Sequence, residues 1–186
     1  RRQARRDIQR GLDGNKSIAF VNIKGGATKT TATYLTAAIF GTVRGGSVLA
    51  WDANENKGTL GDRALESPHD RTAVDLLSNL DFFSGGRNQH ELVQYMRPQG
   101  DLRFDVLASQ NTAGTSAVVD GAGFLAMRET LRAFYRMMFV DTGNSPSGLT
   151  WESVVQTADL LVICSSNKED QVKVAASTID TLQKSG

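Results

Sequence analysis

The chain has 186 residues, of which 40% are hydrophobic and 22% are charged, and its formal net charge is +1. This composition is ordinary for a soluble globular protein, and the length suits one core-forming domain better than two. No apolar run approaches the roughly 18 residues of a membrane helix, and we expect no signal peptide. The single cysteine, Cys164, lies in an apolar run and predicts a buried thiol without a disulfide partner. These features predict a cytoplasmic protein without a transmembrane segment.

The first ten residues hold a dense cluster of positive charge. Five arginines against one aspartate give this segment +4, so the rest of the chain carries −3. The arginines are Arg1, Arg2, Arg5, Arg6 and Arg10. They could contact nucleic acid or an anionic membrane surface, and a solvated helix without such a partner is the alternative. We expect residues 1–16 to form a basic arm and residues 17–186 to form the domain.

A glycine-bearing turn lies between an apolar run, Ile18 to Val21, and a helical pattern that ends near Val43. Strand, turn and helix in this order can form a phosphate cradle, because backbone N–H groups and the positive end of the helix converge on the anion. Lys29 supplies a charge that can reach the β- and γ-phosphates, and the Thr30 hydroxyl is placed to bind Mg²⁺. The predicted nucleotide-binding residues are Lys24, Gly25, Gly26, Ala27, Thr28, Lys29, Thr30 and Thr31.

Thr28 departs from the general phosphate-binding loop, which has glycine directly before the lysine. If φ is positive at this position, a β-branched residue costs at least about 1–2 kcal/mol. If φ is negative, the cost is mainly steric. In either case we expect nucleotide binding to be weaker than with glycine at this position, but not lost.

Two aspartates directly follow apolar strands. Asp52 follows a strand at 47–51, and Asp141 follows a strand at 137–140. A carboxylate at a strand tip beside a phosphate loop can hold Mg²⁺ or manage an attacking water, although a lone aspartate there is more often a cap. We expect Asp141 to hold Mg²⁺ through a water opposite Thr30, with Asp52 as a second candidate ligand.

The rest of the chain alternates between predicted helices and strands. Further strands are expected at 104–108 and 159–164, and helices at 71–80, 89–96, 124–135, 151–158 and 168–186. The aromatic stripe of residues 124–135 predicts core packing, and His69 and His90 lack metal-ligand spacing. The alternation predicts an α/β fold, a doubly wound and mostly parallel sheet with helices on both faces.

The stretch from Lys24 to Thr31 resembles the deviant phosphate-binding loop of the ParA/MinD family of ATPases and departs from it only at Thr28. The similarity runs from about residue 17 to 186 and is strongest to actinobacterial members, some of them encoded near type VII secretion systems. It implies a P-loop NTPase fold that binds ATP and Mg²⁺ and forms an ATP-dependent homodimer, in which Lys24 reaches the partner's phosphates. Family members usually continue further, so we expect this domain to lack its C-terminal part.

The resemblance also implies two switch segments. The first contains Asp52, Asn54 and Gly58, and the second contains Asp141, Thr142 and Gly143. The family has a second aspartate at the position of Asn54, and asparagine can orient a water but cannot accept its proton. We therefore expect slow hydrolysis by a weak ATPase. Its expected catalytic residues are Lys24, Lys29, Asp52 and Asn54.

Three functions follow from these patterns. The first is an ATP-dependent dimerisation switch that partitions DNA or positions a cargo. The second is a degenerate P-loop scaffold with little ATPase activity, which Thr28 and Asn54 favour. The third is a nucleic-acid-binding module that uses the arginine arm and has a steep salt dependence. The sequence predicts neither the cargo nor the adenine contacts.

Overall fold

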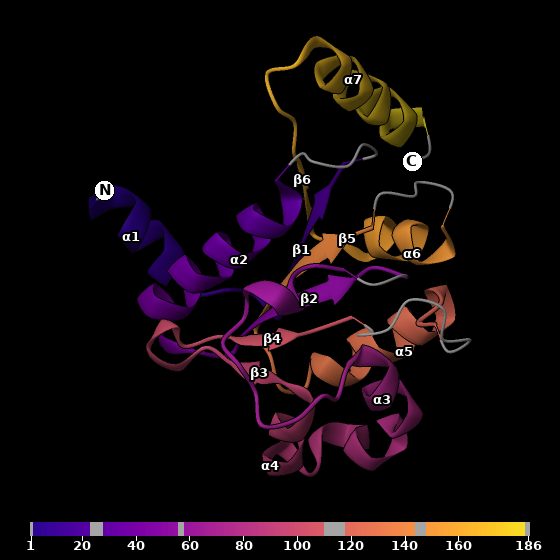
Figure 1. The fold of residues 1–186 in the computed structure, drawn as a ribbon. Coiled ribbons are helices and arrows are strands. Elements are labelled where there is room, and N and C mark those ends of the chain that lie inside the picture. The colour runs from indigo at the N-terminus through magenta and orange to yellow at the C-terminus, as the bar shows by residue number, and fades with distance from the viewer. Residues whose placement is uncertain (1, 23–27, 56–57, 110–117, 144–147, 185–186) are drawn as a thin grey trace.

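The computed structural model describes residues 2–22, 28–55, 58–109, 118–143 and 148–184 (Figure 1). Its strands form one six-stranded sheet in the order β3-β4-β2-β5-β1-β6. They are β1 (Lys16–Val21), β2 (Val48–Ala53), β3 (Arg97–Pro98), β4 (Asp105–Leu107), β5 (Met137–Thr142) and β6 (Leu160–Ile163). All neighbouring strands are parallel except β3, which runs antiparallel to β4. The predicted mostly parallel sheet is confirmed.

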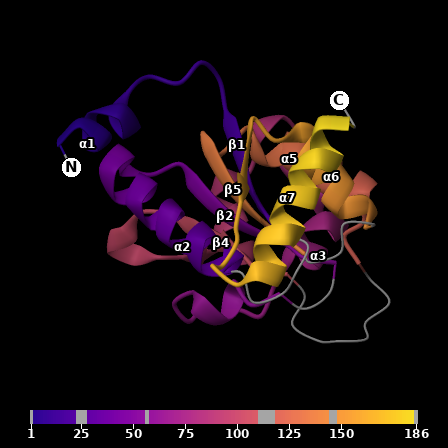
Figure 2. The same cartoon turned by 90° about the horizontal axis from the view of Figure 1, so that it is seen from above.

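Helices cover both faces of the sheet, as the alternation of elements predicts. The α-helices are α1 (Arg2–Gln9), α2 (Lys29–Phe40), α3 (Ala73–Ser78), α4 (Gln89–Leu92), α5 (Gly121–Leu131), α6 (Leu149–Thr157) and α7 (Glu169–Lys184). Helix α2 lies on one face, and α3, α5 and α6 lie on the other, whereas α7 stands apart from these layers (Figures 1 and 2). A π-helical turn, Gly41–Gly45, extends α2.

Alternating side chains of the strands supply the two cores. On β5, Phe139 faces α2 and its ring lies 5.0 Å from that of Phe40. Met138 and Val140 point to the opposite face, where α5 and α6 pack. On that face Trp51 stacks on Phe124 at 4.5 Å. This contact confirms that the aromatic stripe of residues 124–135 belongs to the core.

Strand β6 differs from the prediction of a buried strand. It is the edge strand of the described sheet and pairs only with β1, so Leu160 is 55% exposed. Cys164, which follows β6, is half-buried for the same reason, so the prediction of a buried thiol was wrong in degree. The expected helix at 89–96 is a single helical turn, α4, followed by a 3₁₀ turn, Val93–Tyr95. None of the helices in the described segments combines the length and the apolar character needed to cross a membrane.

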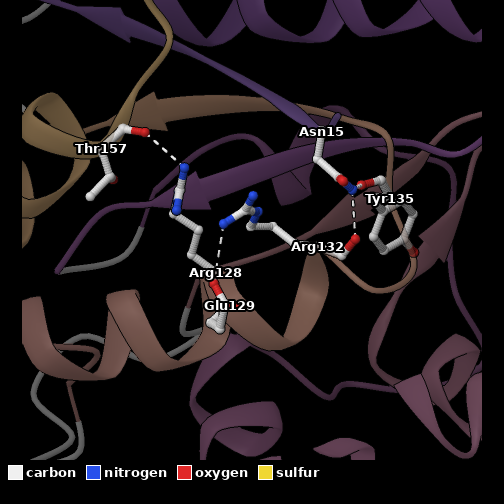
Figure 3. Close-up of polar contacts among 6 residues, drawn as sticks. All are labelled: Asn15, Arg128, Glu129, Arg132, Tyr135 and Thr157. Atoms are coloured by element: carbon white, nitrogen blue, oxygen red, sulfur yellow. Dashed lines mark hydrogen bonds and ion pairs between the residues drawn. The ribbon is translucent and has the colours of Figure 1, made fainter. Parts of the chain in front are cut away.

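Hydrogen bonds at the amino-terminal edge of the sheet hold the carboxyl ends of α5 and α6 in place. Asn15, directly before β1, donates from Nδ2 to the carbonyls of Arg132 and Tyr135, both at 2.6 Å (Figure 3). Arg128 on α5 donates to the Thr157 carbonyl at the end of α6, at 2.9 Å (Figure 3). These bonds hold the layers together at one edge and leave the loops at the opposite, carboxyl edge to form a site.

Candidate nucleotide site

The site lies where the carboxyl ends of β1, β2 and β5 meet the amino end of α2. Strand β5 lies between β1 and β2 in the sheet, although β1 and β2 are joined through α2 in sequence. This order brings Asp141 beside the first turn of α2 and makes Asp52 its register partner. Residues on parallel strands that end at one edge thus meet at one point, as expected for a doubly wound fold.

The predicted phosphate loop is described only at its end. Lys24, Gly25, Gly26 and Ala27 lie outside the described residues. Thr28 precedes α2 with φ 62° and ψ 14°, which is the left-handed conformation. The backbone at Thr28 therefore has positive φ, and a β-branched residue is strained in this conformation.

Lys29 and Thr31 occupy the first turn of α2. Lys29 is 7% exposed, and burial lowers the pKa of its ammonium group, while Asp141 and Cys164 act in the opposite direction. A buried ammonium group requires anionic neighbours, and Asp141 is one of them. Thr31 is half-buried next to these residues in sequence. The amino end of α2 adds further positive potential, so this turn favours an anion.

Thr30 and Asp141 form the polar centre of the site. The Thr30 hydroxyl donates to Asp141 Oδ2 at 2.5 Å, and Asp141 is only 1% exposed. Burial, followed by the charge of Asp52, raises the pKa of Asp141 to about 7, while Thr30, Lys29 and Arg63 lower it.

The second oxygen of this carboxylate supports the predicted metal site. Within the part of the chain that the structure describes, the buried Asp141 Oδ1 has no hydrogen-bond partner. A buried carboxylate oxygen without a partner, beside a threonine hydroxyl, fits a hard cation that prefers oxygen ligands. The residues present therefore fit Mg²⁺, which the Thr30 hydroxyl and the Asp141 carboxylate would hold.

Asp52 anchors the loop that follows β2. It is 1% exposed, and its Oδ1 accepts from the Asn54 side chain at 2.6 Å and from the Asn54 N–H at 3.2 Å. Its Oδ2 accepts from the Leu60 N–H at 3.2 Å. A Cβ atom on Gly58 would collide with both carboxylate oxygens, so the loop passes directly over Asp52. Burial raises the pKa of Asp52, and hydrogen bonds from Asn54, Leu60 and Ser109 lower it. Both oxygens have protein partners, which favours a structural role over metal binding.

Ser109 belongs to this arrangement, although the sequence analysis did not select it. It follows strand β4 after one residue, Ala108, and is 5% exposed. Its hydroxyl accepts from the Gly58 N–H at 2.7 Å and also bonds to Asp52. Arg97 on β3 holds the same loop further along by donating to the Gly61 carbonyl at 2.8 Å. The only sequence signal for Ser109 is a polar residue after an apolar strand, which is too common to be selective.

Asn54 connects the two predicted switch segments. Its side-chain N–H donates to Asp52, and its Oδ1 lies so close to Gly143 that a Cβ there would be 3.1 Å away. Thr142 ties the end of β5 to β1 by donating to the Phe20 carbonyl at 2.9 Å. The structure thus brings Asp52, Asn54 and Gly143 together, and the amide expected to orient a water is engaged by protein groups.

The basic residues lie at the other edge of the sheet. Helix α1 precedes β1 and contacts the turn that follows α2, both at the amino-terminal edge (Figure 2). Arg2, Arg5, Arg6 and Arg10 are exposed there, and Arg10 lies 3.3 Å from Asp7. Arg1 is outside the described residues. The structure therefore separates this arm from the site at the carboxyl edge.

Comparison with known sequences gives a distant relative. No family model matches the chain. It is 24% identical over 179 residues to the ESX-1 secretion-associated protein EspI of Mycobacterium tuberculosis. That match covers 96% of this chain and 26% of EspI, so the chain spans about a quarter of the relative's length.

Solved structures give a clearer result for the fold. A ParA family ATPase from Chlorobium tepidum superposes with a TM-score of 0.76 at 18% identity, covering 90% of this chain and 67% of that one. The ATP complex of Cyanothece McdA(D38A) superposes with a TM-score of 0.66 at 16% identity, and the match covers 94% of this chain and 66% of that one. The kinase domain of the Escherichia coli tyrosine kinase ETK superposes with a TM-score of 0.64 at 17% identity, and the match covers 90% of this chain and 63% of that one. The chain has a ParA/MinD-like P-loop fold.

Proposed function

We propose that this chain, which has a ParA/MinD-like P-loop fold, binds ATP with Mg²⁺ and hydrolyses it slowly as a dimerisation switch. The observation that carries the proposal is the 2.5 Å contact of Thr30 with Asp141 at the amino end of α2, beside the buried Lys29. A hydroxyl, a carboxylate and an ammonium group at a helix start are the groups that P-loop proteins use on a nucleotide and its metal.

Each group has a separate task in this proposal. The amino end of α2 and Lys29 bind the phosphates, and Thr30 and Asp141 hold Mg²⁺. When bound, Mg²⁺ would neutralise charge on the β- and γ-phosphates. Asn54 donates to Asp52 and has no carboxylate to accept a proton, so turnover is expected to be slow.

Dimerisation and cargo are further parts of the proposal. The homodimer depends on Lys24, which would reach the phosphates bound by the partner. The similarity to a ParA family ATPase and to a plasmid partition protein from Borrelia burgdorferi supports a role in partitioning DNA or positioning a cargo. The similarity to EspI supports a secretion system as one setting for that role. We propose that the P-loop domain covers residues 17–186.

Particle mass tests the switch directly. We would measure it by light scattering without nucleotide, with ADP and with a non-hydrolysable ATP analogue, each with Mg²⁺. A monomer that dimerises only with the analogue is the expected result, and Lys24→Glu should abolish the dimer. Arg87→Glu, at an exposed arginine before α4, is the control for charge reversal. A Lys24→Glu variant that still dimerises, or a wild type that binds no nucleotide, would contradict the proposal.

A P-loop scaffold with little ATPase activity is the second candidate. The left-handed backbone at Thr28 and the engagement of Asn54 by Asp52 both favour it. Phosphate release by the wild type, measured against Lys29→Ala, separates the two. Release equal to that of Lys29→Ala, with nucleotide binding retained, would favour the scaffold.

The arginine arm supports a nucleic-acid contact as a third candidate. Arg2, Arg5 and Arg6 are exposed on one short helix at the edge opposite the nucleotide site. If they bind phosphates, affinity for a random DNA duplex should fall steeply with salt. A plot of the logarithm of the binding constant against the logarithm of the salt concentration should have a slope of about −0.9 per neutralised phosphate. Deletion of residues 1–10 should remove this binding. A salt-independent affinity, or an unchanged affinity after deletion, would contradict it.

A further inference from the structure

Glu55 forms a bridge between the loop after β2 and the start of α6. We propose that Glu55 is a positioning residue that couples residues 58–60, at the end of the loop after β2, to the start of α6, so that these two parts move together. The inference rests on the proposed function, because both segments border the proposed nucleotide site.

The first observation is a helix cap supplied from a distant part of the chain. Glu55 Oε1 accepts from the Thr150 N–H at 3.2 Å, across 95 residues of sequence. Thr150 is in the first turn of α6, whose N-cap residue, Gly148, makes no side-chain cap bond. The first N–H groups of a helix have no partner within the helix, and a carboxylate there is also favoured by the helix dipole. Glu55 therefore takes the place of a local cap.

The second observation is close contact at both ends of the β5–α6 connection. Gly143 directly follows β5, and Gly148 directly precedes α6. A Cβ on Gly148 would lie 2.6 Å from Glu55 Oε1, and a Cβ on Gly143 would lie 3.1 Å from Asn54 Oδ1. The absence of side chains at these glycines lets the consecutive residues Asn54 and Glu55 approach both ends of the connection.

The third observation is that each of the two parts that Glu55 joins also has contacts of its own. The loop after β2 is held at Gly58 by Ser109 and at Leu60 by Asp52. Helix α6 is held by the Thr150 hydroxyl, which donates to the Val119 carbonyl at 2.9 Å, and by the buried Val154. A displacement of either part therefore changes the contact that Glu55 makes with the other. In the proposed switch, a change that nucleotide imposes on one segment would reach the other.

Hydrogen exchange without nucleotide gives the first test. In Glu55→Ala, exchange of peptides covering 148–153 and 58–60 should both rise, by roughly threefold to thirtyfold at α6, the range for loss of a helix cap. Glu55→Gln keeps an acceptor oxygen and should lie between the wild type and Glu55→Ala. Glu152→Ala is the matched control, because it removes a carboxylate from the first turn of α6 that bonds Gln156 rather than the loop. Unchanged exchange in Glu55→Ala, or a rise confined to α6, would overturn the coupling.

A second test asks whether nucleotide moves the two segments together. With the non-hydrolysable ATP analogue and Mg²⁺, both peptides of the wild type should become protected. In Glu55→Ala only one should respond, with nucleotide affinity largely retained. A joint response in Glu55→Ala would overturn the inference. If the wild type binds no nucleotide, the proposed function fails, while the nucleotide-free comparison still decides whether Glu55 links the segments.

Discussion

Asp52 and Asp141 are register partners on β2 and β5, and each is only 1% exposed. Two buried carboxylates on adjacent strands oppose each other's ionisation, and burial raises the pKa of both, that of Asp141 to about 7. The partners of Asp52 are loop N–H groups and side chains, whereas Asp141 has a hydroxyl partner and one unbonded oxygen among the described residues. Asp52 is therefore suited to anchor the loop after β2, and Asp141 is suited to hold a cation.

Stability of the nucleotide-free protein should depend on pH through Asp141. Its folded pKa of about 7 lies above the ordinary value of 3.8, so the folded state retains a proton that the unfolded chain releases. The resulting stabilisation is complete below about pH 3.8 and is lost as pH rises through about 7. Asp141→Asn should show a smaller loss of unfolding free energy between pH 5 and pH 8 in urea titrations. Asp101→Asn, at an exposed aspartate, is the control, and equal pH dependence in all three proteins would contradict the assignment.

Replacing Thr28 by glycine should strengthen the phosphate site. Glycine adopts the observed φ of 62° without the cost of about 1–2 kcal/mol for a side chain in the left-handed region. We expect tighter ATP binding by calorimetry. Thr28→Ala, which keeps Cβ and loses the branch, should give a smaller gain. A dissociation constant that is unchanged in Thr28→Gly would show that the strain does not affect binding.

Adding one methyl group at Gly58 should displace the loop after β2. The new Cβ would collide with both oxygens of Asp52, and overpacking of this kind typically costs about 1–3 kcal/mol. Gly58→Ala should therefore lower the free energy of unfolding and raise hydrogen exchange at residues 58–60. Gly11→Ala is the control, because its Cβ would meet no atom within 4 Å. Equal stability of the two variants would mean that the loop is not held against Asp52.

Introducing a carboxylate at position 54 should destabilise the protein, most strongly at high pH. The Asn54 side chain donates to Asp52 at 2.6 Å, and an aspartate there would replace this bond by repulsion. Asn54→Asp should lose more unfolding free energy at pH 8 than at pH 5, because a shared proton relieves the repulsion at the lower pH. Asn54→Ala removes the bond without adding charge, so the difference between its losses at pH 8 and pH 5 should be smaller than that of Asn54→Asp. A loss in Asn54→Asp that does not vary with pH would rule out repulsion between residues 52 and 54.

The sequence by itself determined the fold class and the order of its parts. Apolar runs that end in Asp52 and Asp141, and a glycine-bearing turn before a helix, are local patterns, and the strands and helices that they predict are present. The resemblance of Lys24 to Thr31 led to the ParA/MinD-like fold that the solved structures share. The roles assigned to these residues stay predictions.

Only the tertiary structure decided which of these residues meet and what each can do. Strand order places β5 between β1 and β2, which brings Thr30 to Asp141, 111 residues away. The same packing encloses Asp52 with Ser109, and it brings Glu55 to the start of α6. It also leaves β6 at an edge of the sheet that the described strands form. These contacts join segments far apart in the chain, and local periodicity carries no information about which strands become neighbours.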